Sequence, residues 1–249
     1  MEISIIILFF LIGIFCGSFI TLAVYRIPLK QDILIKHSYC PNCNHKLGFF
    51  DLFPIFSYIF LCGKCRYCKT KIRLRYFIIE LLCGIVFVFL GYSLFFRFKI
   101  IDIFFYLIYV ILLFIIAGID KECGNISKGV LIFGYIVEFF YIIYQCTLGN
   151  INVYQYVIYL ILSIIVLLLT AISYSKNINF KYYIKILYLS LFIIVFHGSI
   201  IFILSAILTL LAVAINSSVN KKGKIIIGFY LCISNILVII ISEILKYCF

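Results

Sequence analysis

Charged residues are scarce in this chain, and their scarcity limits what it can be. Only 12% of its 249 residues are Asp, Glu, Lys or Arg, whereas 66% are hydrophobic. The mean hydropathy of +1.26 lies far outside the range of a soluble domain. Tryptophan is absent as well, so tyrosine must fill the aromatic role at membrane–water interfaces. The composition excludes a large soluble enzyme domain and indicates a polytopic membrane protein.

The few charges that are present are mostly basic. Lys and Arg number 21 against nine Asp and Glu, which gives a net charge of +12. In a soluble protein this excess would suggest nucleic acid, but in a membrane protein the Lys/Arg bias of cytoplasmic loops explains it. We therefore expect contact with a lipid bilayer and none with nucleic acid.

Long apolar runs predict an all-α membrane protein of about eight transmembrane helices. Residues 1–25 form the first helix, because their uncharged run is too long for a signal-peptide core. Residues 76–249 form a membrane domain of about seven more. The segment 182–215 is too long for one span, and loop charge favours two crossings that turn near His197, with both termini outside. The other spans are expected at 76–96, 100–119, 129–146, 151–174 and 225–245.

Four cysteines stand out in the hydrophilic insert of residues 26–75. They form two C-x2-C pairs, Cys40 with Cys43 and Cys65 with Cys68. This pattern is typical of a closed structural zinc site; another soft metal, two disulfides or simple packing are the alternatives. The insert carries ten of the 21 basic residues, which predicts a cytoplasmic location, where disulfides are rare. Cys62 breaks the paired spacing and is expected outside the metal shell.

Acidic residues in or beside membrane spans are costly, so each requires an explanation. Asp120 ends the third span in the run IDKECG, with Glu122 two residues further on. Glu80 lies near the start of the second span, where pairing with a basic residue such as Arg73 is a simpler explanation than catalysis. Glu138 is expected in the middle of a span, where either function or internal hydrogen bonding would account for it.

Several sequence blocks stand out together in the first third of the chain. They are GSFITLAVYRIP at 17–28, CPNC at 40–43, DLFPIFSY at 51–58, GKCRYC at 63–68 and IRLRYFIIELLCG at 72–84. In this order and spacing they resemble the amino-terminal half of the type IV prepilin leader peptidases. These are bifunctional inner-membrane enzymes of bacterial pilus, type II secretion and competence systems.

This resemblance implies a multi-pass protein of the bacterial inner membrane that acts on prepilin or pseudopilin substrates. The substrate's leader would be cut at the cytoplasmic face, and the new amino terminus would be methylated with S-adenosylmethionine as cofactor. Cleavage in the family resembles that of intramembrane aspartyl proteases, in which two carboxylates face one water. Asp120 matches the first of the family's two aspartates and is the candidate catalytic residue.

The second family aspartate has no counterpart in this chain. Its nearest equivalent is FKYYIK at 180–185, which keeps Lys185 but has Tyr183 where the aspartate belongs, and no aspartate follows Asp120. Tyrosine is neutral at pH 7 and cannot replace the carboxylate. We therefore expect an aspartic prepilin peptidase and N-methyltransferase by family, with weakened cleavage. The alternatives are a methyltransferase-only or substrate-binding relative and a non-enzymatic assembly factor; the scarcity of charge in the spans argues against a transporter.

Overall fold

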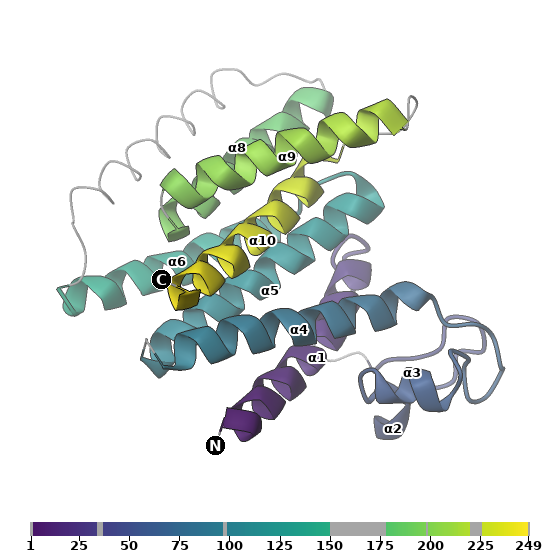
Figure 1. The fold of residues 1–249 in the computed structure, drawn as a ribbon. Coiled ribbons are helices and arrows are strands. Elements are labelled where there is room, and N and C mark those ends of the chain that lie inside the picture. Colours follow the sequence, from purple (N-terminus) through teal and green to yellow (C-terminus); the bar gives the residue numbers. More distant parts are fainter. Residues whose placement is uncertain are drawn as a thin grey trace. The chain divides into compact units, whose positions relative to one another are not determined.

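A computed structural model describes residues 2–33, 37–96, 99–149, 178–197, 199–219 and 226–248, and within these ranges the protein is all-helical. Two short helices, α2 and α3, separate two long ones, α1 and α4, and five further long helices follow (Figure 1). The helices are α1 (Glu2–Arg26), α2 (Phe49–Leu52), α3 (Phe56–Phe60), α4 (Leu74–Phe95), α5 (Ile100–Cys123), α6 (Lys128–Thr147), α8 (Ile178–His197), α9 (Ser199–Val219) and α10 (Ile227–Cys248).

Five of the described helices are long and apolar enough to cross a membrane, namely α1, α4, α5, α6 and α10. The expected all-α, multi-pass membrane protein is thereby confirmed. The segment 182–215 divides into α8 and α9 on either side of residue 198, where the sequence predicted a turn, and the two helices pack together. The span expected at 151–174 lies outside the described residues, so the total of eight stays a prediction.

The chain packs as two compact units, Met1–Ile111 and Leu112–Tyr247. The sequence-based division at residues 25 and 75 follows membrane topology instead, and it stays a prediction. The four paired cysteines fall in the first unit and Asp120 in the second. Each candidate site can therefore be described within a single unit.

Close packing of α1 against α4 forms the framework of the first unit (Figure 1). A Cβ added at Gly13 would lie 2.7 Å from Gly84 Cα, and one at Gly17 would lie 2.7 Å from Glu80 Cα. These pairings run in opposite directions along the two helices, so the helices are antiparallel. Gly13 and Gly17 form the small-xxx-small pattern that lets membrane helices approach closely. The Arg26 end of α1 and the Leu74 end of α4 consequently lie on the same side.

The polypeptide leaves α1 through a well-bonded turn. Arg26 is almost fully buried, and its guanidinium donates hydrogen bonds to the carbonyl oxygens of Asp32 at 3.0 Å and His37 at 3.1 Å. These bonds fix the start of the cysteine-rich insert relative to the end of the first span.

In the second unit, α6 packs on α8 through Tyr135. Its hydroxyl donates a 2.7 Å hydrogen bond to the carbonyl oxygen of Tyr188, and its ring contacts Phe192 edge-on. Glu138 is buried in the same helix, as the mid-span placement predicted. Among the described residues no hydrogen bond reaches its Oε1 atom.

Candidate metal centre and the Asp120 site

The four cysteines of the two C-x2-C pairs converge on one point. The Sγ atoms of Cys40, Cys43, Cys65 and Cys68 all lie within 4.8 Å of one another, and Cys62 is not part of the group. The Sγ atoms of Cys40 and Cys68 are 3.7 Å apart. A tetrahedral zinc with Zn–S bonds of about 2.3 Å requires sulfur–sulfur separations of about 3.8 Å. The donor set and its spacing therefore fit a zinc ion or a similar soft metal.

The two cysteine turns are copies of one structure, repeated with an offset of 25 residues. The amide of Cys40 donates to the carbonyl of His45, as that of Cys65 does to Thr70. Asn44 and Lys69, both at positive φ, donate back to the carbonyls of Cys40 and Cys65. Isolated bridges close the turns, Tyr39 with Lys46 and Lys64 with Lys71.

This repeat is not visible in the sequence, since residues 38–47 and 63–72 share only their two cysteines and one lysine. The repeated feature is the hydrogen-bonding pattern of the backbone. Each turn points two sulfurs inward in the same way, and the turns face each other with the rings of His45 and Tyr67 in contact at 3.5 Å between centroids. The candidate metal site thus has two halves with the same backbone hydrogen bonds.

Local hydrogen bonds prepare two of the thiols for metal binding. The Thr70 hydroxyl lies 3.0 Å from Cys68 Sγ, and several hydrogen bonds, this one foremost, lower the pKa of Cys68 to about 5. The backbone N–H of Cys43 likewise lowers the pKa of Cys40. Because the thiolate is the metal-binding form, Cys68 is ready to bind at neutral pH.

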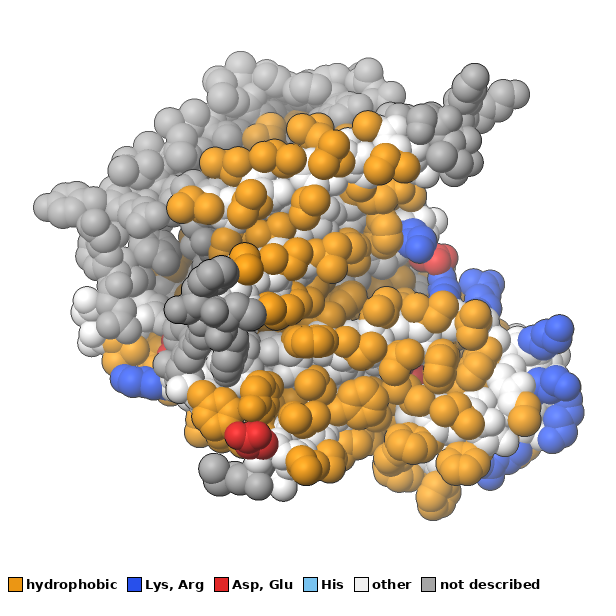
Figure 2. Space-filling model, in the orientation of Figure 1, with side chains coloured by type: hydrophobic (Ala, Val, Ile, Leu, Met, Phe, Trp, Pro, Cys, Tyr) orange, Lys and Arg blue, Asp and Glu red, His pale blue; other side chains and the backbone are white. Residues whose placement is uncertain are grey.

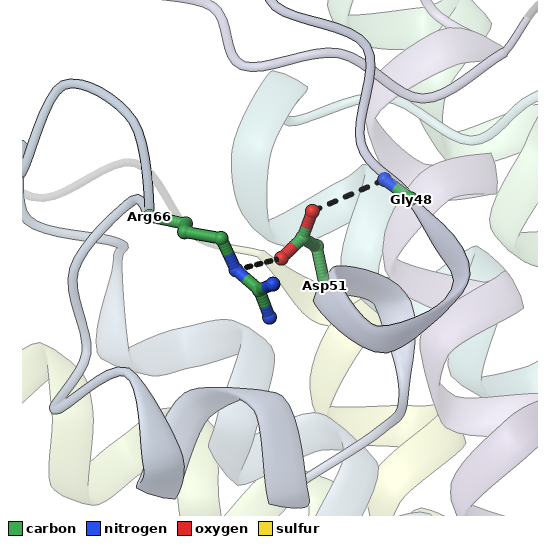
Figure 3. Close-up of polar contacts among 3 residues, drawn as sticks. All are labelled: Gly48, Asp51 and Arg66. Atoms are coloured by element: carbon green, nitrogen blue, oxygen red, sulfur yellow. Dashed lines mark hydrogen bonds and ion pairs between the residues drawn. The ribbon is translucent and has the colours of Figure 1, made fainter.

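An ion pair ties the second cysteine turn to α2. Arg66 Nε lies 2.8 Å from Asp51 Oδ1, and the other carboxylate oxygen accepts a 3.1 Å hydrogen bond from the Gly48 amide (Figure 3). The Asp51 side chain is only 5% exposed. The pair therefore holds the segment between the two cysteine turns against the metal centre.

The sequence suggested that Glu80 pairs with a basic residue such as Arg73, but its partner in the structure is a backbone N–H. Glu80 is buried in α4, and its Oε2 atom accepts a 2.7 Å hydrogen bond from the backbone N–H of Ile55. Ile55 has a φ of +63°, which is strained for a β-branched residue. The sequence could not reveal this partner, because no local signal predicts a left-handed isoleucine. The carboxylate satisfies a donor at a sharp bend between α2 and α3.

Asp120 is fully buried, and it caps another helix. Its Oδ2 atom accepts hydrogen bonds from the Tyr182 hydroxyl and from the Phe229 amide, each at 2.9 Å. Phe229 lies in the first turn of α10, where free N–H groups and the helix dipole favour a negative charge. The neighbouring Gly228 is required, because a Cβ there would lie 2.8 Å from Asp120 Oδ2.

The Tyr182 hydroxyl of α8 contacts Asp120. Tyr182 lies one position before Tyr183, the residue that the spacing from Lys185 indicated. The Gly228 amide also donates to the Tyr182 hydroxyl, at 3.3 Å. Lys185 itself donates a 2.6 Å hydrogen bond to Asn125 Oδ1. Adjacent residues on a helix point about 100° apart, so spacing to a motif lysine could not tell which tyrosine faces the carboxylate.

Part of the first unit is similar to known proteins. A family model described as the bacterial peptidase A24 N-terminal domain matches residues 11–94. The same part of the chain is similar to proteins named prepilin leader peptidase/N-methyltransferase. A protein of that name from Vibrio cholerae is 42% identical over 89 residues, which are 32% of this chain and 35% of the relative. One from Bacillus subtilis is 35% identical over 125 residues, 50% of this chain and 49% of the relative.

Similarity to this family is confined to part of each protein, since the matches span about a third to a half of those two relatives' length. No solved structure gives a significant match. The matched residues of the A24 N-terminal domain include all four cysteines and Glu80, and they end before Asp120. With five described helices long and apolar enough to cross a membrane, the protein is a multi-pass membrane protein.

Proposed function

We propose that the protein N-methylates the amino termini of prepilin or pseudopilin substrates with S-adenosylmethionine, and that it cleaves their leaders far more slowly than relatives with two aspartates. The observation behind this proposal is the bonding of Asp120. A single carboxylate oxygen accepts hydrogen bonds from Tyr182 and from the amino terminus of α10. That arrangement is suited to holding three helices together.

Peptide hydrolysis by an aspartyl protease needs two carboxylates at one water, one to accept its proton and the other to support the carbonyl oxygen. In this chain the residue that contacts Asp120 from α8 is a tyrosine, whose hydroxyl already donates its hydrogen to that carboxylate. Asp120 is therefore proposed as the remaining member of the catalytic pair, acting here mainly in structure.

Zinc, bound by Cys40, Cys43, Cys65 and Cys68, would act as a structural cross-link, because four protein thiolates leave no open coordination position for a substrate. Residues of this chain would hold the remainder of the insert in position. The paired cysteine turns position the segment between them, and the Asp51–Arg66 ion pair fixes that segment to the second turn. No residues are assigned to S-adenosylmethionine.

The test separates the two reactions by mass spectrometry. Purified protein would be incubated with S-adenosylmethionine and either an intact prepilin or a matching peptide whose leader has already been removed. We expect one methyl group on the cleaved peptide and little leader removal from the intact one. Absence of methylation from both substrates would overturn the proposal in favour of an assembly factor.

Variants identify which carboxylates take part in any residual cleavage. We expect Tyr183→Asp or Tyr182→Asp to increase leader removal, the second because its position faces Asp120. Efficient cleavage by the unaltered protein that is lost in Asp120→Asn and also in Glu122→Gln or Glu138→Gln would show that a glutamate serves as the second carboxylate. In that case the weakened-cleavage proposal would be wrong.

A further inference from the structure

The segment between the two cysteine turns carries an apolar surface that the described part of the first unit does not cover. Neither α2 nor α3 has a buried residue. Phe49 is 69% exposed, Phe50 75% and Phe60 80%, and Phe56 and Ile59 are exposed beside them. Figure 2 shows hydrophobic side chains over this region, next to a group of Lys and Arg side chains. Such a patch on a water-facing loop requires a partner.

Two contacts fix the depth of this segment against the helices that cross the membrane. The Phe53 ring packs edge-on against Phe15 of α1 at 5.4 Å, and the Ile55 amide donates to Glu80 of α4. Phe15 lies 11 residues before Arg26, about 16 Å along the helix, and Glu80 lies six residues into α4, about 9 Å.

This depth places the contacts inside the bilayer. A 25-residue helix is about 37 Å long and the hydrocarbon layer about 30 Å thick, so the ends of α1 protrude by only a few ångströms on each side. Phe53 and Ile55 therefore lie below the membrane surface, although they belong to the hydrophilic insert.

Backbone bonding suits such a position, because donors in hydrocarbon must be satisfied within the protein. The amides of Phe56, Ser57 and Ile59 donate to Pro54, Phe53 and Ile55 carbonyls, while Pro54 has no N–H. The remaining amide of this bend, that of Ile55, donates its hydrogen bond to the Glu80 carboxylate. A buried carboxylate in a membrane span is thereby accounted for.

The charges around the patch complement an anionic membrane surface. Residues 38–75 carry seven Lys and Arg and a single acidic residue, Asp51, which is paired with Arg66. Aromatic residues at the acyl boundary with basic residues at the headgroups are the arrangement of interfacial membrane segments.

We propose that residues 49–60 are seated in the cytoplasmic leaflet of the bilayer, with Phe49, Phe50, Phe56, Ile59 and Phe60 in contact with lipid. Glu80 anchors the bend from within the membrane. The metal centre, which flanks this segment on both sides in sequence, is then held at the membrane surface. This inference rests on the geometry of the first unit and not on the proposed function.

The absence of tryptophan makes the proposal directly measurable. Phe60→Trp places a single fluorescent reporter on the patch of the full-length protein in vesicles that contain acyl-brominated lipids. Phe89→Trp on the exposed face of α4 serves as the membrane reference, and Tyr67→Trp on the second cysteine turn serves as the aqueous reference. We expect brominated lipid to quench position 60 much as it quenches position 89, and acrylamide to quench it far less than position 67.

Lipid quenching at position 60 no greater than at position 67 would overturn the proposal; if acrylamide were excluded as well, a protein partner or a second copy covers the patch instead. The role of Glu80 has its own matched pair. Glu80→Gln keeps an acceptor for the Ile55 amide and should leave position 60 in lipid, whereas Glu80→Leu should expose it to acrylamide. Equal quenching in both variants would show that Glu80 does not anchor the segment.

Discussion

The Tyr182 hydroxyl donates a 2.9 Å hydrogen bond to Asp120 Oδ2 across 62 residues of sequence. The same oxygen accepts the Phe229 amide, so one buried carboxylate connects α5, α8 and α10 within the second unit. Polar contacts between apolar helices hold them in one rotation and register, because apolar packing alone gives little specificity in lipid. The residue that the sequence suggested as catalytic is thus also part of the framework.

Removal of this carboxylate should destabilise the protein. We expect Asp120→Ala to lower the free energy of unfolding by about 1–3 kcal/mol, because two partly buried donors lose their acceptor. Asp120→Asn retains an acceptor oxygen and should cost less. Thermal unfolding in detergent measures both, with Tyr182→Phe as a variant that removes one donor only. An Asp120→Ala protein as stable as the parent would show that the hydrogen bonds contribute nothing.

The close approach of α1 and α4 should not tolerate even a methyl group. Gly13→Ala would bring its Cβ within 2.7 Å of Gly84 Cα and 2.8 Å of the Cys83 carbonyl oxygen, so the helices must separate. We expect a loss of about 1–3 kcal/mol in stability, typical of overpacking. Gly129→Ala is the matched control in α6, where the nearest atom to the new Cβ is 4.0 Å away. Equal melting temperatures for the two variants would contradict the packing described here.

Elemental analysis should give about one zinc per chain, held by the four paired cysteines. Cys65→Ser removes a ligand and should lose the metal. Cys62→Ser, only three residues away, should keep it, because Cys62 lies outside the converging group. Unchanged zinc in the first variant, or loss of zinc in the second alone, would require a different ligand set.

Metal release by acid should depend on Thr70. The low pKa of Cys68, about 5, arises chiefly from its hydrogen bond with the Thr70 hydroxyl. A lowered pKa keeps the thiolate available above that value, and the advantage is lost as the pH falls through it. Thr70→Val should raise the pKa of Cys68. Protons then compete with zinc for the Cys68 sulfur at higher pH, and zinc affinity falls about tenfold. Chelator competition across a pH series measures this, and Thr70→Ser, which keeps the hydroxyl, should behave like the parent.

The sequence was most informative where structure is local. The four cysteines could be grouped from their spacing alone, because a C-x2-C turn fixes two sulfurs without help from distant residues. The apolar runs likewise predicted α1, α4, α5, α6 and α10 from composition. The division of residues 182–215 into two helices was also predicted, because loop charges can be counted from the sequence alone.

Long-range contacts of single side chains could not be predicted from the sequence. Glu80 was expected to meet a cation, but its partner is a backbone N–H exposed by the left-handed Ile55. Tyr182 could not be chosen over Tyr183, because that choice depends on the rotation of α8 about its axis. The packing of the segment 49–60 against α1 and α4 could not be predicted either, since its apolar residues are too few to indicate a span.

The pairing of α1 with α4 closes a loop that runs from Ile27 to Arg73 and contains both halves of the metal site. Closing a loop costs chain entropy, and a bound metal that joins residue 40 to residue 68 restricts the same stretch beforehand. Metal affinity and helix association are then thermodynamically linked, each strengthening the other by the same free energy. A variant such as Gly13→Ala, more than 25 residues from any ligand, should consequently bind zinc more weakly in chelator titrations, and removal of zinc should loosen a helix pair that contains no ligand.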